Sequence, residues 1–380
     1  MKALFRFLII PILLFRFAAY GQDGPTYLFA GTYTDGQPDK GIYIYRFNPR
    51  NGKLKLTGHG DGITNPSFLT LSPDGRFLYA CTDTKMPKPG SVTAFSIDPA
   101  KGRITPTNKQ SAGGENPVYV AADQTGRFVV EGNYTGGSAS VFTVRDDGGL
   151  DPAEQFLQFT GSGVIADRQE KSHVHSTVFS PDNRYVFMPD LGADKIRVFR
   201  FDQDTALPLQ PMEDLDITAT PGAGPRHFTF HPNGRFAYCA EELSGTVCAY
   251  SYRDGQLDSL QRVFAYSRKQ DIYSSADIHV SPDGKFLYVS NRLDQENTIA
   301  VFSIDPASGK LSLAGHQSTL GDTPRNFTLD PTGRYLLVAN QATNNIFVFK
   351  RDPATGLLTR TGKEVRVPAP SCLQMRTYGR

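Results

Sequence analysis

Hydrophobic and polar positions along the chain repeat as short apolar strands separated by polar turns. Runs rich in Phe, Tyr, Val and Leu alternate with clusters of Pro, Asp, Asn and Gly, a pattern typical of β-strands and tight turns. One turn element recurs six times, with starts 51, 57, 51, 50 and 49 residues apart. In most copies Pro presets φ for the turn and Gly takes the positive-φ position. The copies are Ser72–Phe77, Asp123–Phe128, Ser180–Tyr185, His231–Phe236, Ser281–Phe286 and Asp330–Tyr335.

Each recurring turn lies between two apolar strands. A third strand follows, as at Ile299–Ile304, and then a second turn such as Asp305–Lys310. The period of about 50 residues therefore holds four short strands. Four strands in such a period are the unit of a β-propeller blade.

The two ends of the chain predict how the ring of blades closes. Tyr27–Tyr33 matches a second strand but has no first strand before it, whereas Pro370–Gln374 resembles the first strand Pro66–Thr70. The C-terminal strand should complete the blade that the N-terminus begins, which removes open sheet edges. We predict an all-β fold, a seven-bladed β-propeller over residues 22–380, closed by pairing of the N- and C-terminal strands.

Residues 1–21 are expected to form a secretory signal peptide. Lys2 and Arg6 precede an apolar run, and Ala19–Gly21 offers a small-x-small cleavage site before Gln22. The apolar run is too short for a stable transmembrane anchor, and the alternative is an uncleaved interfacial anchor. We therefore expect an exported, periplasmic protein that is cleaved near Gly21 and Gln22.

Charge narrows the range of partners. The formal charge of +2 becomes −1 when the three cations Lys2, Arg6 and Arg16 leave with the signal peptide, and no basic stretch remains. Nucleic acid is therefore not an expected partner, nor is stable insertion into a membrane. The 39% hydrophobic and 21% charged residues are typical of a globular protein.

The four cysteines show no metal-binding spacing. Cys239 and Cys248 flank a predicted hairpin turn. Two interpretations stay open for them, a disulfide formed in the export compartment or two buried thiols on neighbouring strands. The other two are Cys81 and Cys372.

Candidate chemistry is sought where the repeats differ. The start of each first strand and the end of each second strand lie at the same end of a blade, opposite the recurring turn. At the first of these positions the blades carry Ser67, Val118, His175, Arg226, Ala276, Arg325 and Ser371. At the second position they carry Tyr33, Asp83, Tyr134, Leu191, Glu242, Arg292 and Gln341.

Charged groups and an imidazole replace small or apolar residues at this rim on neighbouring blades. They are His175, Arg226, Glu242, Arg292 and Arg325. Three arginines near one glutamate leave excess positive charge, which favours a site that binds and turns over a small anionic molecule. The alternative is that these residues only form ion pairs between blades.

Residues next to the rim positions favour structural roles. Glu241 occupies a position that is Asn in other blades, which suggests a turn-bonding role. His279 and Asp277 lie one register away from the rim, so a buried hydrogen-bonded pair is expected, and His231 lies at the far end of its blade. His173 alternates with the rim imidazole as metal ligands can, but no further ligand completes a set. We expect no metal and no cofactor.

Several further segments are distinctive. They are Gly224–His227, Glu242–Leu243, Ala276–Gly284, Asn291–Arg292, Thr298–Phe302 and Pro324–Phe327. With these segments the mature chain resembles the seven-bladed propeller lactonase family, whose named activity is 6-phosphogluconolactonase and which includes carboxymuconate-cyclising enzymes. The resemblance implies a site of one His, two Arg and one Glu, which fall on His175, Arg226, Glu242 and Arg292.

The resemblance and the rim positions together predict a lactone hydrolase that opens a sugar or sugar-acid lactone. Glu242 or His175 would act as general base on water. Arg226 and Arg292 would hold the anionic group of the substrate and stabilise the developing oxyanion. Further substrate contacts are expected from Arg325, His227, Tyr134, Tyr33 and Gln341.

Two other functions remain open, a lactonising cyclase acting on an unsaturated dicarboxylate and a non-catalytic ligand-binding propeller. The family's best-known activity belongs to a cytoplasmic pathway, whereas this chain carries an export signal. Whether the lactone is phosphorylated is therefore open as well. We expect a monomer or a weak homo-oligomer whose partner is a small anionic lactone or sugar acid.

Overall fold

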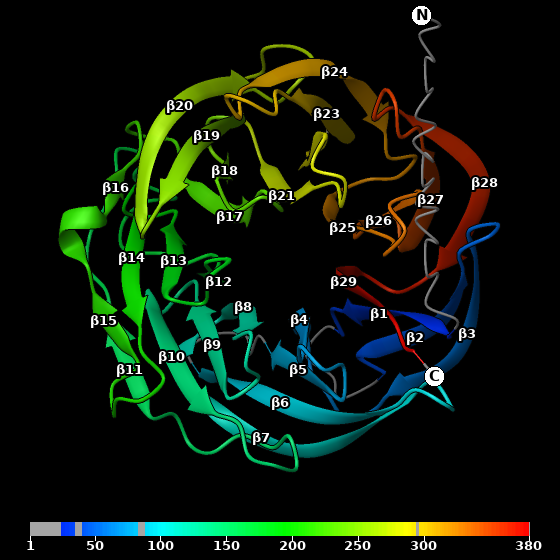
Figure 1. The fold of residues 1–380 in the computed structure, drawn as a ribbon, viewed down its shortest axis with the longest axis horizontal. Helices are drawn as coiled ribbons and strands as arrows, with labels where there is room; N and C mark the ends of the chain where they lie inside the picture. Colours follow the sequence, from blue (N-terminus) through cyan, green and yellow to red (C-terminus); the bar gives the residue numbers. More distant parts are fainter. Residues whose placement is uncertain (1–23, 35–39, 83–87, 294–295, 380) are drawn as a thin grey trace, which may run out of the picture.

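The computed structural model describes residues 24–379, except 35–39, 83–87 and 294–295, and arranges seven sheets in a ring around a central axis (Figure 1). Six of the sheets have four strands and one has five. The predicted seven-bladed β-propeller is confirmed. The predicted signal peptide at residues 1–21 lies outside the described residues. Among the residues that the structure describes, no helix is long and apolar enough to cross a membrane.

The blades follow the chain in order, and their strands are given from the axis outwards. The first blade contains β29 (Pro370–Thr377), β1 (Thr26–Thr32), β2 (Ile42–Asn48) and β3 (Lys53–Gly60). The second contains β4 (Pro66–Leu71), β5 (Phe77–Thr82), β6 (Pro89–Asp98) and β7 (Arg103–Glu115). The third contains β8 (Pro117–Ala122), β9 (Phe128–Asn133), β10 (Ser138–Thr143) and β11 (Gln155–Gln158).

The fourth blade is the least regular, with β12 (Val178–Phe179), β13 (Tyr185–Asp190), β14 (Lys195–Phe201), β15 (Leu209–Pro211), the 3₁₀ helix η1 (Glu213–Leu215) and β16 (Ile217–Thr218). The fifth contains β17 (Pro225–Phe230), β18 (Phe236–Glu241), β19 (Thr246–Arg253) and β20 (Gln256–Phe264). The sixth contains β21 (Ser275–Val280), β22 (Phe286–Asn291), β23 (Thr298–Ile304) and β24 (Leu311–Ser318). The seventh contains β25 (Pro324–Leu329), β26 (Tyr335–Asn340), β27 (Asn345–Arg351) and β28 (Leu358–Arg366).

The ring closes as the sequence predicts. Strand β29 pairs antiparallel with β1, with Leu28 opposite Met375 and Gly31 opposite Cys372. The Ser371 hydroxyl also donates to the Pro66 carbonyl of the second blade at 2.6 Å. The last strand of the chain is thereby held by its neighbours on both sides, near the axis (Figure 1).

The recurring turn is stabilised by its first residue. At the start of the sixth blade the Ser281 hydroxyl donates to Asp283 at 2.6 Å and accepts from the Phe286 N–H at 3.0 Å. Gly284 has a φ of +71°, which an L side chain rarely adopts. Where Asp replaces Ser, its carboxylate accepts the same N–H, as Asp330 does from Tyr335 at 2.7 Å.

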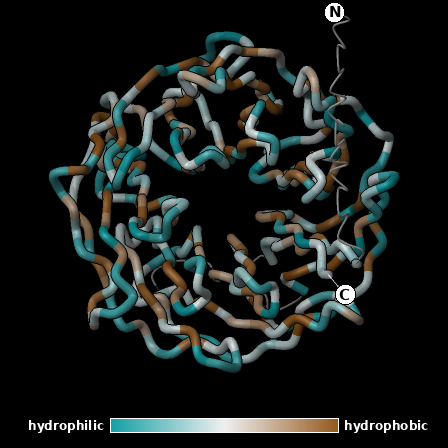
Figure 2. Tube along the Cα trace, viewed as in Figure 1, coloured by the Kyte–Doolittle hydropathy of each residue, from teal (hydrophilic) through white to brown (hydrophobic). Residues whose placement is uncertain are grey.

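Neighbouring blades meet where an aromatic ring covers a glycine. Gly309, in the second turn of the sixth blade, has φ +71°, and a Cβ there would lie 2.4 Å from the Phe236 ring of the fifth blade. The Tyr238 hydroxyl donates to the Gly309 carbonyl at 2.9 Å. Gly356 meets Phe286 in the same way one blade further on. The hydrophobic clusters lie mainly between pairs of adjacent sheets, and apolar residues recur around the whole ring (Figure 2).

All four cysteines are free and buried. Cys239 and Cys248 lie directly opposite each other on β18 and β19. Of the two interpretations of this pair, the structure has the buried thiols and not the disulfide. Burial raises the pKa of the Cys239 thiol well above its usual value, which suppresses the reactive thiolate.

A buried carboxyl in the third blade has no ion-pair partner among the described residues. Glu131 on β9 is fully buried, and burial raises its pKa well above the usual value. One of its oxygens accepts from the Asn133 amide at 3.2 Å. Its other oxygen and the Asn133 amide oxygen have no hydrogen-bond partner. Two adjacent acceptors without a donor favour the protonated form of Glu131.

This carboxyl predicts a pH-dependent change in stability. Because its pKa is raised in the folded state, the unfolded chain ionises first, and Glu131 opposes folding increasingly as the pH rises above its usual pKa. Glu131→Gln should therefore stabilise the protein at pH 8, by roughly 1–3 kcal/mol, and much less at pH 5. Urea unfolding at both pH values measures this, with the exposed Glu154→Gln as control. An equal effect at the two pH values would contradict the interpretation.

Candidate active site

The rim positions coincide with β-bulges at the start of the inner strands. In the fifth blade the register of β17 and β18 shifts between Pro225 and His227, so that Arg226 is the bulged residue. The same shift in other blades falls on Ser67, Val118 and Arg325. A bulge turns a side chain away from the regular alternation of a strand. These four inner strands can therefore each present one residue toward its neighbours across the rim.

Glu242, directly after β18, is the centre of an ion cluster formed with three arginines. Its Oε2 lies 2.8 Å from Arg226 Nε and 3.2 Å from Arg292 Nη2, and its Oε1 accepts from Arg168 Nη2 at 2.6 Å. The contact with Arg226 Nε is an ion pair without the alignment of a hydrogen bond. We call these four residues the Glu242 cluster. The expected ion pairs between blades are present, yet three guanidinium groups face one carboxylate.

Burial strengthens the electrostatic interactions within the cluster. The side chains of Arg226 and Glu242 are 1% and 5% exposed. Burial would raise the pKa of Glu242, but Arg292, Arg226 and Arg168 lower it to about 2. Glu242 is therefore a carboxylate at every physiological pH. Its proton affinity is too low for an effective general base near neutral pH.

Arg226 and Arg292 are also anchored to the backbone of the sixth blade. Arg226 Nη1 donates to the Ala276 carbonyl at 2.7 Å, and Arg292 Nε donates to the Ser274 carbonyl at 3.2 Å. Burial, and then the charge of Arg292, lowers the pKa of Arg226. The two guanidinium groups are thus held in fixed positions before any ligand binds.

His175 lies beside the cluster on an irregular inner strand. Val174 forms an isolated bridge with Asp190, and β12 begins only at Val178. Between this bridge and β12, the Ser176 hydroxyl donates to the Arg226 carbonyl at 2.8 Å. Burial, followed by Arg226, lowers the pKa of His175 well below its usual value, and its buried Nδ1 has no hydrogen-bond partner within the part of the chain that the structure describes. His175 is a neutral imidazole with an unused nitrogen.

His227 contacts His175 and is fixed from the other side. The two rings meet edge to face, with centroids 5.3 Å apart. The Nδ1–H of His227 donates to the buried carboxylate of Asp277 at 2.8 Å, and Asp277 also accepts from His279 at 2.9 Å and Asn326 at 2.6 Å. Burial and Arg226 lower the pKa of His227 to about 4. The expected hydrogen bond between Asp277 and His279 is present, and Asp277 binds His227 as well. Asp277 is buried as expected, whereas the His279 side chain is 38% exposed.

The remaining predicted contacts lie around this centre. The Tyr134 ring meets His175 edge to face, with centroids 5.3 Å apart. Arg325 lies over the Tyr33 ring at 5.3 Å, and its charge contributes to the lowered pKa of His175. Gln341 follows β26, where its N–H donates to the Thr323 carbonyl. No hydrogen bond of the described residues joins Gln341 to the Glu242 cluster, so it is the predicted contact that the structure connects least to the site.

The neighbouring candidates have structural contacts. Glu241 makes two hydrogen bonds with Arg262 at 2.6 and 2.7 Å. His231 bonds the Gly284 carbonyl of the next blade at 2.8 Å. His173 bonds the Tyr134 carbonyl and stacks on the Tyr134 ring, with centroids 4.4 Å apart. Within the described residues no three His, Cys, Asp or Glu side chains gather as a metal-binding group.

Arg168 is the member of the cluster that sequence comparison of the repeats missed. It lies between β11 and β12, outside the four strands that define the repeat. The signal for it is the interval of 57 residues between the second and third recurring turns, against 49 to 51 elsewhere. An insertion of this kind in one blade marks a loop with its own role.

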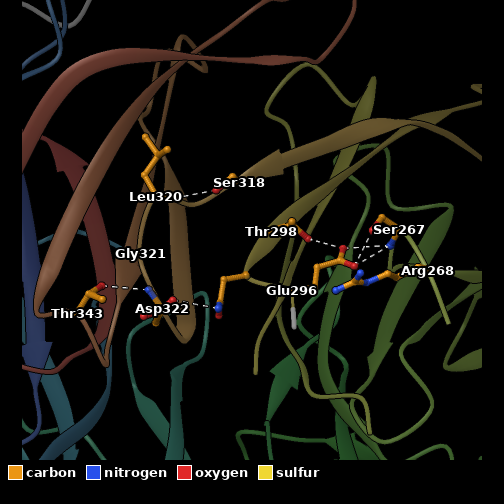
Figure 3. A pocket seen from close by; sticks show the side chains of 10 residues that line it. Ser267, Arg268, Glu296, Thr298, Ser318, Leu320, Gly321, Asp322 and Thr343 are labelled. Carbon is orange, nitrogen blue, oxygen red and sulfur yellow. Dashed lines mark hydrogen bonds between the residues drawn. The ribbon is translucent and has the colours of Figure 1, made fainter. Parts of the chain in front are cut away.

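A wide polar hollow of about 660 Å³ lies between the sixth and seventh blades. Two carboxylates line it, Glu296 and Asp322, and Glu296 accepts from the Ser267 hydroxyl at 2.7 Å and the Thr298 hydroxyl at 2.9 Å (Figure 3). Because two carboxylates and one guanidinium, Arg268, line the hollow, it lacks the excess positive charge of the Glu242 cluster. The cluster is the better candidate for an active site.

Fold and site together define a seven-bladed β-propeller with a buried, cationic, imidazole-containing site at one mouth of its axis. The chain belongs to the family described as "Lactonase, 7-bladed beta-propeller", whose model matches residues 27–375.

The chain is similar to curated and solved members along nearly its whole length. It is 44% identical to a 6-phosphogluconolactonase of Formosa agariphila over 92% of this chain and 99% of the relative. It is 36% identical to a 6-phosphogluconolactonase of Bacillus subtilis over 91% and 97%. The solved structure of a periplasmic gluconolactonase of Pseudomonas aeruginosa has a TM-score of 0.87 and 37% identity, covering 92% of this chain and 99% of that one.

The Glu242 cluster predicts a large loss of stability when its carboxylate is neutralised. Glu242→Gln leaves three guanidinium groups, two of them buried, without a counter-charge. We expect a loss of about 3–5 kcal/mol in the free energy of unfolding, measured by urea titration at pH 7. The exposed Glu154→Gln should change it by less than about 0.5 kcal/mol. A loss for Glu242→Gln no larger than that of this control would contradict the arrangement.

Proposed function

We propose that this protein is a lactone hydrolase that opens a sugar or sugar-acid lactone, with His175 as the general base. The observation that carries the proposal is a buried, neutral imidazole with an unused nitrogen beside a cluster with excess positive charge. Membership of the lactonase family and the named activities of the relatives support the same reaction.

The choice of base follows from which group has an available acceptor atom. Both oxygens of Glu242 are engaged by arginines, and its pKa of about 2 makes it a poor acceptor of a proton from water. The His175 imidazole is neutral because burial and Arg226 lower its pKa, and its Nδ1 has no hydrogen-bond partner among the described residues, so a lone pair is available to accept the proton. Glu242 instead holds the arginines in place. Of the two bases that the sequence left open, we therefore assign the role to His175.

The reaction then proceeds in two steps. His175 removes a proton from water while the water oxygen bonds the lactone carbonyl carbon, and the carbonyl oxygen becomes an oxyanion. Arg226 and Arg292 stabilise this charge from fixed positions. The bond between the carbonyl carbon and the ring oxygen then breaks, and the imidazolium returns the proton to the ring oxygen. The product is a hydroxy acid, whose carboxyl group loses its proton to solvent.

We further propose that the protein acts after export, as a periplasmic enzyme cleaved near Gly21 and Gln22. The layout of residues 1–21 supports this, and a structural neighbour is named as a periplasmic gluconolactonase. An exported enzyme would meet lactones outside the cytoplasm, which leaves phosphorylated and unphosphorylated lactones as substrates to compare.

Hydrolysis of a lactone panel tests the proposal. Protein recovered from the periplasmic fraction, expected to begin at Gln22, is given glucono-δ-lactone and its 6-phosphate, and acid release is followed against the spontaneous rate. His175→Ala should lower kcat by about 10²–10⁴-fold, the usual contribution of a general base, while the exposed His59→Ala leaves it unchanged. Turnover on no lactone, with product formed from a muconate instead, would favour the cyclase.

The dependence of kcat on pH tests the assignment of the base. Because the pKa of His175 is lowered, it stays unprotonated as the pH falls through 6.5, and kcat should hold its plateau there and decline only at lower pH. Arg325 contributes to this lowering, so Arg325→Gln should move the decline to higher pH. A decline centred at or above pH 6.5 in the parent protein would exclude His175 as the base.

A further inference from the structure

Arg168, in the segment between β11 and β12, differs from the other two arginines of the Glu242 cluster. Arg226 and Arg292 are 1% and 10% exposed, whereas the Arg168 side chain is 37% exposed. Arg226 and Arg292 share Glu242 Oε2, and Arg168 takes Oε1 alone. Of the three guanidinium groups, Arg168 is the one that an incoming molecule can reach most easily.

The loop that carries Arg168 is held rigidly. The next residue, Gln169, is fully buried, and its amide donates to the Leu191 carbonyl at 2.8 Å and accepts from the Ile165 N–H at 3.1 Å. The backbone adds bonds from Arg168 N and Gln169 N to the Ile165 carbonyl, at 3.0 and 2.7 Å. The guanidinium is therefore positioned before a ligand arrives, and binding does not have to order this loop.

The charge of the cluster requires an anion at this place. Glu242 neutralises one of three guanidinium charges, and its pKa of about 2 keeps it ionised as a ligand binds. Since Arg226 and Arg292 also donate to backbone carbonyls of the sixth blade, their remaining freedom is small. A guanidinium that is 37% exposed at the open side of such a cluster matches the oxygens of a phosphate or carboxylate.

We propose that Arg168 is the specificity-determining residue that selects lactones carrying an anionic substituent over uncharged lactones, without taking part in ring opening. This inference rests on the lactonase function proposed above. The chemistry it requires is an oxyanion on the substrate away from the lactone carbonyl. A phosphate ester and a carboxylate both supply this, and they are compared as separate substrates.

The test compares substrates across three variants. Glucono-δ-lactone is the neutral substrate, and its 6-phosphate and the monolactone of a sugar diacid are the anionic ones. Arg168→Gln should raise KM for the anionic lactones about tenfold or more, change kcat little, and leave the neutral lactone within about twofold. Arg168→Lys should recover part of the loss, and Arg200→Gln, on the exposed side of the same blade, is the matched control.

Several outcomes would overturn the proposal. If Arg168→Gln weakens turnover of neutral and anionic lactones equally, Arg168 acts only through Glu242. If the substitution changes neither KM nor kcat on any lactone, Arg168 neither selects the substrate nor supports Glu242. Folding is not expected to limit the test, because Glu242 keeps two arginines in the Arg168 variants, and thermal unfolding verifies this.

A binding measurement separates this proposal from the proposed function. Inorganic phosphate is titrated calorimetrically into the parent protein and the Arg168→Gln variant. If no lactone is hydrolysed but phosphate binding weakens about tenfold in the variant, the lactonase function fails and anion selection by Arg168 stands. If the lactones are hydrolysed while phosphate binding is absent or unchanged by the substitution, the proposal for Arg168 fails and the lactonase function stands.

Discussion

Pairing of the last strand with the first is the contact on which the arrangement of this protein depends. Each sheet buries its two faces against its neighbours, so an open ring would expose the faces of two blades and the edge of β1. Closure also fixes where the inner strands begin. The bulged residues at these beginnings then lie at a single mouth of the ring. The site therefore depends on complete closure of the ring.

The balance of charge at that mouth explains how an acid, a base and several cations can be buried together. A lone buried carboxylate or guanidinium would be costly, but Glu242 lies among three arginines, two of which also bond backbone carbonyls. The same positive charge keeps His175 neutral. One set of interactions therefore pairs charges between blades and keeps an imidazole unprotonated beside excess positive charge.

The bulge gives the propeller a means of changing function without changing its frame. In the second blade it carries Ser67, which donates to the Pro117 carbonyl of the next blade at 2.6 Å, and in the fifth it carries Arg226, which donates to the Ala276 carbonyl in the same way. Arginine keeps the bond between blades and adds a charge near the axis. One side chain can thus link two blades and carry a charge at the candidate site. The presence of ion pairs between blades therefore does not argue against a functional site.

The number of blades, the closure and the rim positions follow from the sequence alone, because turn chemistry and strand periodicity are local and repeat about every 50 residues. It also placed His175, Arg226, Glu242 and Arg292 at one mouth, since each occupies an equivalent position of its repeat. Arg168 belongs to no repeat position, and the choice between Glu242 and His175 as base depends on burial and on charges from other blades. Neither feature can be derived from the chain alone, because distances between loops of different blades and the desolvation of a side chain have no local signature in the sequence.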